Sequence, residues 1–178
     1  MIPHQRHKVV PSGESGTVRR RAGIAPGGPE GIRDQVFTGE YRHSVDAKGR
    51  LAVPAKFRAQ LDSGAFVSRW MDACLAIWPR AEWEHLAAKV AALPTVENAG
   101  ARLFSRFVFA KATEVVWDAQ GRFVLPGYLR DAIELANEAV IVGSLDHAEI
   151  WTPAGWDEYQ AALADPAELG RHFAGLGI

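Results

Sequence analysis

The sequence predicts an α+β fold, mainly β with short helices, built from two copies of one unit, here called the first and second repeat. Residues 46–50, Asp-Ala-Lys-Gly-Arg, return 72 positions later as Asp-Ala-Gln-Gly-Arg at 118–122. An Ile-Trp pair at 77–78 recurs at 150–151. The offset of 72 also relates Pro54 to Pro126, Phe57 to Leu129, Arg58 to Arg130, and Leu61 to Ile133. Because duplicated units usually complete each other's core, we expect one domain with a pseudo-two-fold axis.

The first repeat begins with a half-buried strand. Residues 37–45 place Phe, Gly, Tyr, His and Val at odd positions and polar side chains at even positions, which is the period of a strand. Asp46 then opens a turn, in which Gly49 takes the positive-φ position of a bulged hairpin. The elements expected next are a returning strand at 50–53, a short helix from Pro54 with Phe57 and Leu61 on its inner face, a strand pair at 64–70 and 74–78, and an amphipathic helix at 79–93.

The second repeat follows the same order. Its expected elements are a strand at 108–117, a turn at 118–121, a strand at 122–125, a short helix at 126–135, strands near 139–144 and 147–151, and a helix at 153–163 capped by Thr152. The chain is therefore divided into a disordered basic extension (1–35), the first repeat (36–93), a linker (94–107), the second repeat (108–164) and a weakly ordered tail (165–178).

Composition excludes several classes of protein. The chain has 178 residues, of which 48% are apolar, and a formal net charge of −1, which suits a globular cytoplasmic protein. No apolar run approaches the roughly 20 residues of a membrane span, and no signal-peptide pattern is present. The six histidines lack metal-ligand spacing, so we expect no metal, no cofactor and no small-molecule substrate. The single Cys74 lies in an apolar stretch and is expected to be buried.

Positive charge is concentrated near the first turn. Residues 1–35 hold six basic and three acidic side chains, which leaves 14 basic and 18 acidic ones in residues 36–178. Within 36–60, five basic side chains stand against two acidic ones. The second turn is poorer in charge, because Gln120 replaces Lys48. A narrow hairpin tip can enter a groove of DNA, where arginine engages phosphates or guanine, so the charge favours the first turn over the second for such a contact and leaves the second repeat as mainly its structural partner.

These residues carry a resemblance to a known family. Segment 37–54, the second turn at 118–122 and the Glu-Ile-Trp at 149–151 resemble the bacterial MraZ proteins over about residues 36–164. The resemblance implies a double-split β-barrel of two tandem AbrB-like swapped-hairpin units, the SpoVT-AbrB domain, and ring-shaped homo-oligomers. It also implies a nucleoid-associated transcriptional regulator, which binds repeats of double-stranded DNA in the promoter of the division and cell-wall gene cluster containing its own gene.

Site residues follow from this resemblance and from the local charge. The predicted DNA-contacting residues are Lys48, Arg50, Arg42 and Arg122. The residues assigned to the structure of the turns are Asp46, Gly49, Asp118 and Gly121. Because MraZ-like proteins usually begin at the strand that starts at Val36, and a valine codon can start translation, residues 1–35 are also interpreted as the product of a misplaced start site.

Plainer interpretations stay open. Arg50 and Arg122 could be ladder arginines paired with the turn carboxylates, and His43 falls on the inward side of its strand. The repeated tryptophans fit packing better than base stacking; they are Trp78, Trp83, Trp151 and Trp156. A ring-forming scaffold without DNA binding is the alternative function. A hydrolase with an aspartate dyad is a remote one, because neither turn has the Asp-Ser/Thr-Gly surroundings of such sites.

Overall fold

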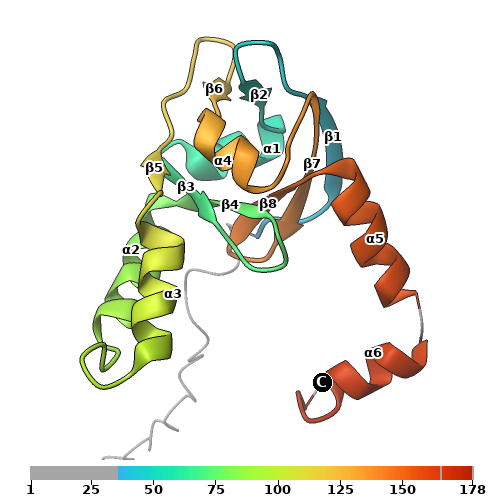
Figure 1. Cartoon of the computed structure of the whole chain (residues 1–178). Helices are drawn as coiled ribbons and strands as arrows, with labels where there is room; N and C mark the ends of the chain where they lie inside the picture. The colour runs from blue at the N-terminus through green and yellow to red at the C-terminus, as the bar shows by residue number, and fades with distance from the viewer. Residues whose placement is uncertain (1–35, 165, 178) are drawn as a thin grey trace, which may run out of the picture. The chain divides into compact units, whose positions relative to one another are not determined.

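The structure, a computed structural model, describes residues 36–164 and 166–177 (Figure 1). The predicted basic extension at 1–35 lies outside the described residues. The described part is a mixed α+β fold with antiparallel sheets, which confirms the predicted α+β class. It is not mainly β with short helices, because its three longest helices have 12, 11 and 11 residues and its longest strand has 7. None of its helices is long and apolar enough to cross a membrane.

Six strands form one antiparallel sheet in which the two repeats are interleaved. Their order is β1 (Glu40–Ser44), β7 (Glu138–Ser144), β8 (His147–Trp151), β4 (Leu75–Pro79), β3 (Ala65–Arg69) and β5 (Thr113–Glu114). By the repeat offset, β1 corresponds to β5, β3 to β7, and β4 to β8. Exchanging each strand for its equivalent reverses the order of the sheet, which is the expected pseudo-two-fold relation. Its centre is the β4–β8 pair, where Ile77 lies opposite Ala148.

The strands that follow the two turns form a second, two-stranded sheet. Here β2 (Arg50–Ala52) pairs with β6 (Arg122–Val124), and Leu51 lies opposite Phe123. Each of these strands also makes a single antiparallel bridge to the residue just before the turn of its own repeat. Leu51 of β2 is bridged to Val45, and Phe123 of β6 is bridged to Trp117. The predicted local hairpin is present at its turn, which the Asp46 N–H closes by donating to the Arg50 carbonyl at 3.1 Å, but along its length β2 pairs with β6. Pairing β2 with β6 places two fully buried side chains, Leu51 and Phe123, in one shared core.

That core includes the helices that follow each small strand. Helix α1 (Ala55–Leu61) buries Phe57 and Leu61, and helix α4 (Gly127–Ala132) buries Leu129. These side chains belong to one buried cluster with Leu51, Phe123, Ile77 and Ile150. The core thus draws equally on both repeats, so neither repeat has a complete core of its own.

Four further helices complete the described chain: α2 (Arg80–Ala91), α3 (Ala99–Phe109), α5 (Pro153–Leu163) and α6 (Pro166–Phe173). The predictions for α2 and α5 are confirmed, and the Thr152 hydroxyl accepts from the Gly155 N–H at 3.0 Å as the N-cap of α5. Trp78, Trp83 and Val108 form a second buried cluster that joins α2 and α3 to the sheet. The tryptophans at 78, 83 and 151 are buried, and Trp156 packs on Trp151, as predicted. Cys74 is also buried as predicted.

Three expected segments differ from the structure. The predicted linker at 94–107 contains most of α3, the predicted strand at 108–117 shrinks to β5, and the predicted tail at 165–178 contains α6. Helix α3 forms because Asn98 caps it, its Oδ1 accepting from the Ala101 N–H at 3.1 Å. Its buried side chains, Ala101 and Val108, share one face of the helix, and burying that face displaces the strand.

Candidate nucleic-acid interface

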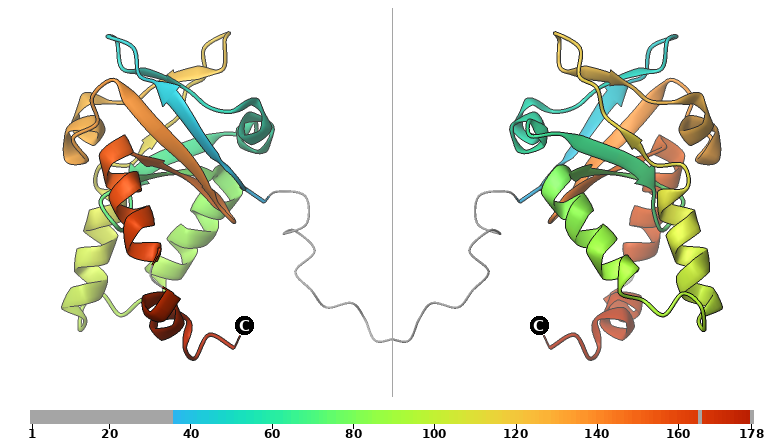
Figure 2. Two further views of the ribbon diagram at one scale, coloured as in Figure 1. Left: turned by 90° about the vertical axis from the view of Figure 1, so that its right-hand side faces the viewer. Right: turned by 90° about the vertical axis from the view of Figure 1, so that its left-hand side faces the viewer.

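The two Asp-x-x-Gly-Arg turns lie at the same end of the structure, next to the β2–β6 pair (Figures 1 and 2). Helices α2 and α3 extend toward the opposite end (Figure 1). The Leu125 N–H donates to the Gly49 carbonyl at 2.8 Å, so the first turn is anchored on the second repeat. The exchange of strands therefore brings the two turns together.

In the first turn, Asp46 organises both backbone and side chain. Its Oδ1 accepts from the Lys48 N–H at 2.9 Å and from the Arg50 N–H at 3.0 Å, and its Oδ2 accepts from Arg50 Nε at 2.6 Å. Gly49 has a φ of 77°, which favours glycine. Lys48 is exposed at the tip, and the side chain of Arg50 is one-third exposed.

The second turn repeats these contacts but adds one. Asp118 Oδ1 accepts from the N–H groups of Gln120 and Arg122, both at 2.9 Å, and its Oδ2 accepts from Arg122 Nε at 2.8 Å. Gly121 has a φ of 71°. In addition, Arg122 Nη2 donates to Gln120 Oε1 at 2.5 Å. Gln120 thus removes a lysine from this tip and also engages the arginine beside it.

Both turn aspartates are held in the ionised form. The hydrogen bond from the Arg50 N–H, with help from its guanidinium, lowers the pKa of Asp46 to about 2. The backbone and side chain of Arg122 lower the pKa of Asp118 in the same way. A shared-proton dyad needs one carboxyl group whose pKa is raised by its neighbour. The turns therefore have the character of two ion-paired caps.

Arg42 is not brought together with the other predicted contact residues. It is exposed on β1, and its Nη2 donates to Asp157 Oδ1 of α5 at 2.8 Å. Glu40 lies 3.8 Å from its Nε. The carboxylate of Asp157 raises the pKa of Arg42. His43, on the same strand, is half-buried, and burial lowers its pKa, in keeping with its predicted inward side.

Two arginines that pack against the turns, Arg58 and Arg130, are not among the residues that the sequence analysis predicts for the site. A Cβ added at Gly121 would meet Arg58 Nη1 of the first repeat, and one added at Gly49 would meet Arg130 Nε of the second. Each turn is thus backed by a helix arginine from the other repeat. Their equivalence was visible in the sequence, since Arg58 and Arg130 are 72 residues apart, but their contacts follow from the exchange of strands.

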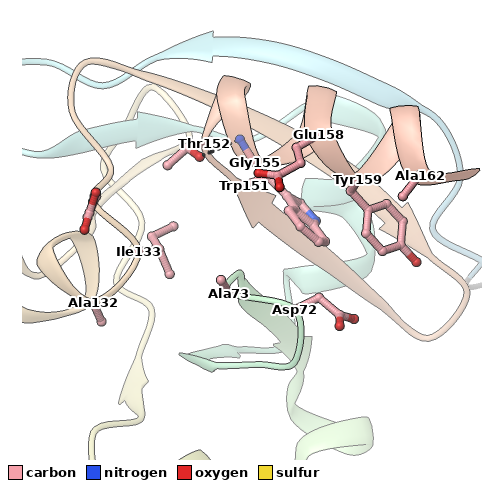
Figure 3. Close-up of a pocket in the computed structure, with 11 residues that line it drawn as sticks. Asp72, Ala73, Ala132, Ile133, Trp151, Thr152, Gly155, Glu158, Tyr159 and Ala162 are labelled. Atoms are coloured by element: carbon pink, nitrogen blue, oxygen red, sulfur yellow. Dashed lines mark hydrogen bonds between the residues drawn. The ribbon is translucent and has the colours of Figure 1, made fainter.

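A hollow elsewhere on the surface has the wrong charge for a nucleic acid. Its volume is about 490 Å³, and it lies between α5, the end of α4 and the turn before β4 (Figure 3). Its ionisable lining side chains besides Tyr159 are carboxylates, namely Asp72, Glu134 and Glu158. Among residues 36–164 and 166–177, no group of His, Cys, Asp and Glu is arranged to hold a metal ion. The turns are therefore the candidate surface for DNA.

The fold and the turns define a tandem-repeat protein whose two equivalent turns lie at one end of the described structure. Comparison with known proteins identifies its family. The family profile described as "MraZ protein, putative antitoxin-like" matches residues 36–107 and 108–169. The chain therefore belongs to the MraZ family of transcriptional regulators and carries two tandem MraZ repeats. This membership confirms the predicted family, and the family is not one of enzymes.

Similar proteins cover most of the chain. The transcriptional regulator MraZ of Roseiflexus sp. (strain RS-1) is 41% identical over 134 residues, which are 75% of this chain and 93% of the relative. That of Halothermothrix orenii is 40% identical over 144 residues, 80% of this chain and 100% of the relative. That of Pediococcus pentosaceus is 45% identical over 123 residues, 69% and 85% of the two chains.

Proposed function

We propose that this protein is a sequence-specific, double-stranded DNA-binding regulator acting at the promoter of the division and cell-wall gene cluster that contains its own gene. The observation that carries the proposal is the pair of turns at one end of the fold, one of which presents Lys48 and Arg50 on a backbone capped by Asp46. The described relatives are named transcriptional regulators, which supports it. A regulator that binds this promoter would act in the cytoplasm, on the nucleoid.

The contacts assign different roles to the predicted residues. Arg50 is held through Nε by Asp46, and its two terminal nitrogens have no partner among the described residues, so they are available to a base edge. Lys48 at the exposed tip suits a phosphate. Arg122 contributes less, because Gln120 engages its Nη2. Arg42 contributes least, because its hydrogen bond to Asp157 must break before it can contact DNA.

We also propose the finer architecture that the resemblance implies. The interleaved order of the large sheet, the β2–β6 pair and the core shared between them support a double-split barrel of two swapped-hairpin units. The exposed apolar side chains support assembly into a ring; among them are Val116, Val124 and Leu145. We keep the repeat boundaries at 36–93 and 108–164, joined by 94–107.

A mobility-shift titration tests the proposal. The probe is a duplex covering the DNA immediately upstream of the protein's own gene, and the control is a scrambled duplex of the same length and composition. We expect preferential binding to the upstream duplex, weakening steeply as salt rises because counterions are released from phosphates. Equal binding to both duplexes would show that the protein binds DNA without sequence specificity. No binding to either would favour the alternative, a scaffold without DNA binding.

A further inference from the structure

Arg58 lies over the turn of the other repeat. It belongs to α1 of the first repeat, yet a Cβ added at Gly121 would come within 1.8 Å of its Nη1 and 2.6 Å of its Cζ. Its Nε is buried without a hydrogen-bond partner. Among the described residues, no carboxylate forms an ion pair with it. Arg58 is therefore a half-buried cation without a counter-charge from the described chain.

The equivalent arginine of the second repeat is held differently. Arg130 lies against Gly49, and its Nε donates to the Leu125 carbonyl at 3.2 Å. Arg130 thus has a hydrogen-bond partner within the protein, whereas Arg58 has none among residues 36–164 and 166–177. A half-buried guanidinium without a partner is costly, so an anionic partner from outside would be strongly favoured.

The second turn also lacks positive charge of its own. Gln120 replaces the lysine of the first turn, and Arg122 is engaged by both Asp118 and Gln120. Arg58 is the cation that remains beside this turn with no partner among the described residues. Arg58 lies next to Gly121, at the base of the second turn. If the tip of this turn enters a groove of DNA, the phosphates that flank the groove would pass close to this position. The planar guanidinium matches a phosphate in a bidentate manner.

We propose that Arg58 is a DNA phosphate-binding residue, contributed by the first repeat to the turn of the second repeat. The proposal rests on the DNA-binding function proposed above. It makes the second turn a composite site, in which one repeat supplies the turn backbone and the other supplies the positive charge. The second repeat then engages DNA although its own tip is neutral at Gln120.

The test compares Arg58→Gln with Arg106→Gln in the full chain. Arg106 is exposed on α3, away from the turns, so its substitution makes the same change of charge at a distant place (Figure 1). The probe is the upstream duplex of the mobility-shift experiment, titrated at several salt concentrations. We expect Arg58→Gln to bind roughly tenfold more weakly, with a salt slope smaller by about 0.9 for each engaged subunit. Arg106→Gln should match the wild type.

Failure of this proposal is distinguishable from failure of the proposed function. If the wild type does not bind the duplex, the DNA-binding function itself is wrong. If the wild type binds and Arg58→Gln keeps the same affinity and slope as Arg106→Gln, only the role of Arg58 is wrong. Thermal unfolding of both variants is measured alongside, because Arg58 also packs on Gly121.

A second measurement uses the wild-type protein alone, in case Arg58→Gln does not fold. Phenylglyoxal modifies accessible arginines, and mass spectrometry reads the extent of modification at each. We expect the duplex to protect Arg58 and leave Arg106 unchanged, with inorganic phosphate at the same ionic strength giving little protection. Equal modification of Arg58 with and without duplex would overturn the proposal. Protection by inorganic phosphate but not by the duplex would also overturn it, since the site would then be one for free phosphate.

Discussion

Arg50 and Arg122 occupy equivalent positions, but their neighbours leave them differently available. Both are tied through Nε to a turn aspartate, at 2.6 and 2.8 Å. Arg122 makes a further hydrogen bond to Gln120, and Lys48 at the same place in the first turn is a donor that cannot do so. One substitution between the repeats therefore changes both the charge of the tip and the freedom of its arginine.

We predict an asymmetry between the two turns in binding to the upstream duplex. Arg50→Ala should cost about 1–3 kcal/mol for each lost base contact and relax sequence preference. Lys48→Ala should weaken binding to all sequences and reduce the salt slope, as a phosphate contact does. Arg122→Ala should weaken binding less than Arg50→Ala. The measurement is a side-by-side titration of folded variants on upstream and scrambled duplexes.

The outcomes of that titration separate the possible arrangements. Equal losses from Arg50→Ala and Arg122→Ala would mean that both turns read bases. Unchanged binding in Arg50→Ala would overturn the assignment of the site. A loss that disappears when the salt concentration is raised would reassign Arg50 to a phosphate.

The first turn should also respond to acid. The hydrogen bonds from Arg50 lower the pKa of Asp46 from 3.8 to about 2, so the folded state binds this proton less readily than the unfolded chain. The contribution of the cap to stability is therefore present above about pH 4 and is lost as the pH falls through about 2. Carbon-13 NMR of the Asp46 carboxyl group measures this directly. A midpoint near 3.8 would show that the cap is not formed in solution.

The turn contacts could be predicted from sequence, but the arginines behind them could not. Asp and Gly at fixed positions encode a capped turn through contacts within five residues, and Asp46 and Asp118 each accept from the N–H group two residues further on. The contact of Arg58 with Gly121 joins residues from different repeats. It depends on which strands pair, and side-chain periodicity carries no information about that.

At the scale of elements, the two repeats contribute strands to one sheet and side chains to one buried core. The sequence shows the strands and most helices, since alternation and helical spacing are local signals. It does not show that β1 pairs with β7, or that β2 pairs with β6. It also does not show α3, which begins after the Asn98 cap inside the segment 94–107 that is predicted as a linker.

The stability of the fold should be sensitive to a single methyl group at Gly143 of β7, where this strand passes close to the chain before β1. A Cβ at Gly143 would lie 2.3 Å from the Thr38 nitrogen and 2.4 Å from the Phe37 carbonyl carbon, both backbone atoms that cannot turn aside. Gly143→Ala should lower the free energy of unfolding by about 1–3 kcal/mol, as overpacking does. Gly170→Ala in α6 is the matched control, because nothing lies within 4 Å of its Cβ. Chemical denaturation of both variants measures the difference, and equal stabilities would contradict the close approach.

The β8 strand carries a buried histidine that should make stability depend on pH. His147 Nδ1 lies 2.6 Å from Asp146 Oδ1, its Nε2 lies 3.4 Å from Glu149 Oε1, and its ring stacks on Trp78 with centroids 4.1 Å apart. Burial lowers the pKa of His147, but the nearby carboxylates of Glu149 and Asp146 outweigh it, so the pKa of His147 is raised above 6.5.

Because the folded pKa of His147 is raised, protonation of this residue stabilises the fold. Its contribution is fully present below about pH 6.5 and is lost as the pH rises through the folded pKa. We expect the melting temperature of the wild type to fall over that interval, and His147→Gln to remove this part of the dependence. An NMR titration that places the pKa of His147 below 6.5 would contradict the prediction.

At the scale of the whole molecule, residues 36–178 are not basic. They hold 14 basic and 18 acidic side chains, so their net charge does not attract DNA, and the proposed binding depends on the local positive charge at the turns. A single pair of narrow tips buries little surface and would bind weakly. Assembly into a ring would place several pairs of tips on one duplex and raise affinity through effective concentration.

Assembly and operator affinity should therefore rise and fall together. Light scattering at micromolar concentration should give a mass several times 19.4 kDa. A duplex with two phased repeats of the operator should then bind about 10²- to 10⁴-fold more tightly than a duplex with one repeat, because the second contact is intramolecular. Shifting the spacing of the repeats by half a helical turn is the control, and it should abolish the gain. If light scattering finds only monomer, or if one and two repeats bind equally per site, the ring is wrong and each chain must read its operator through one pair of turns.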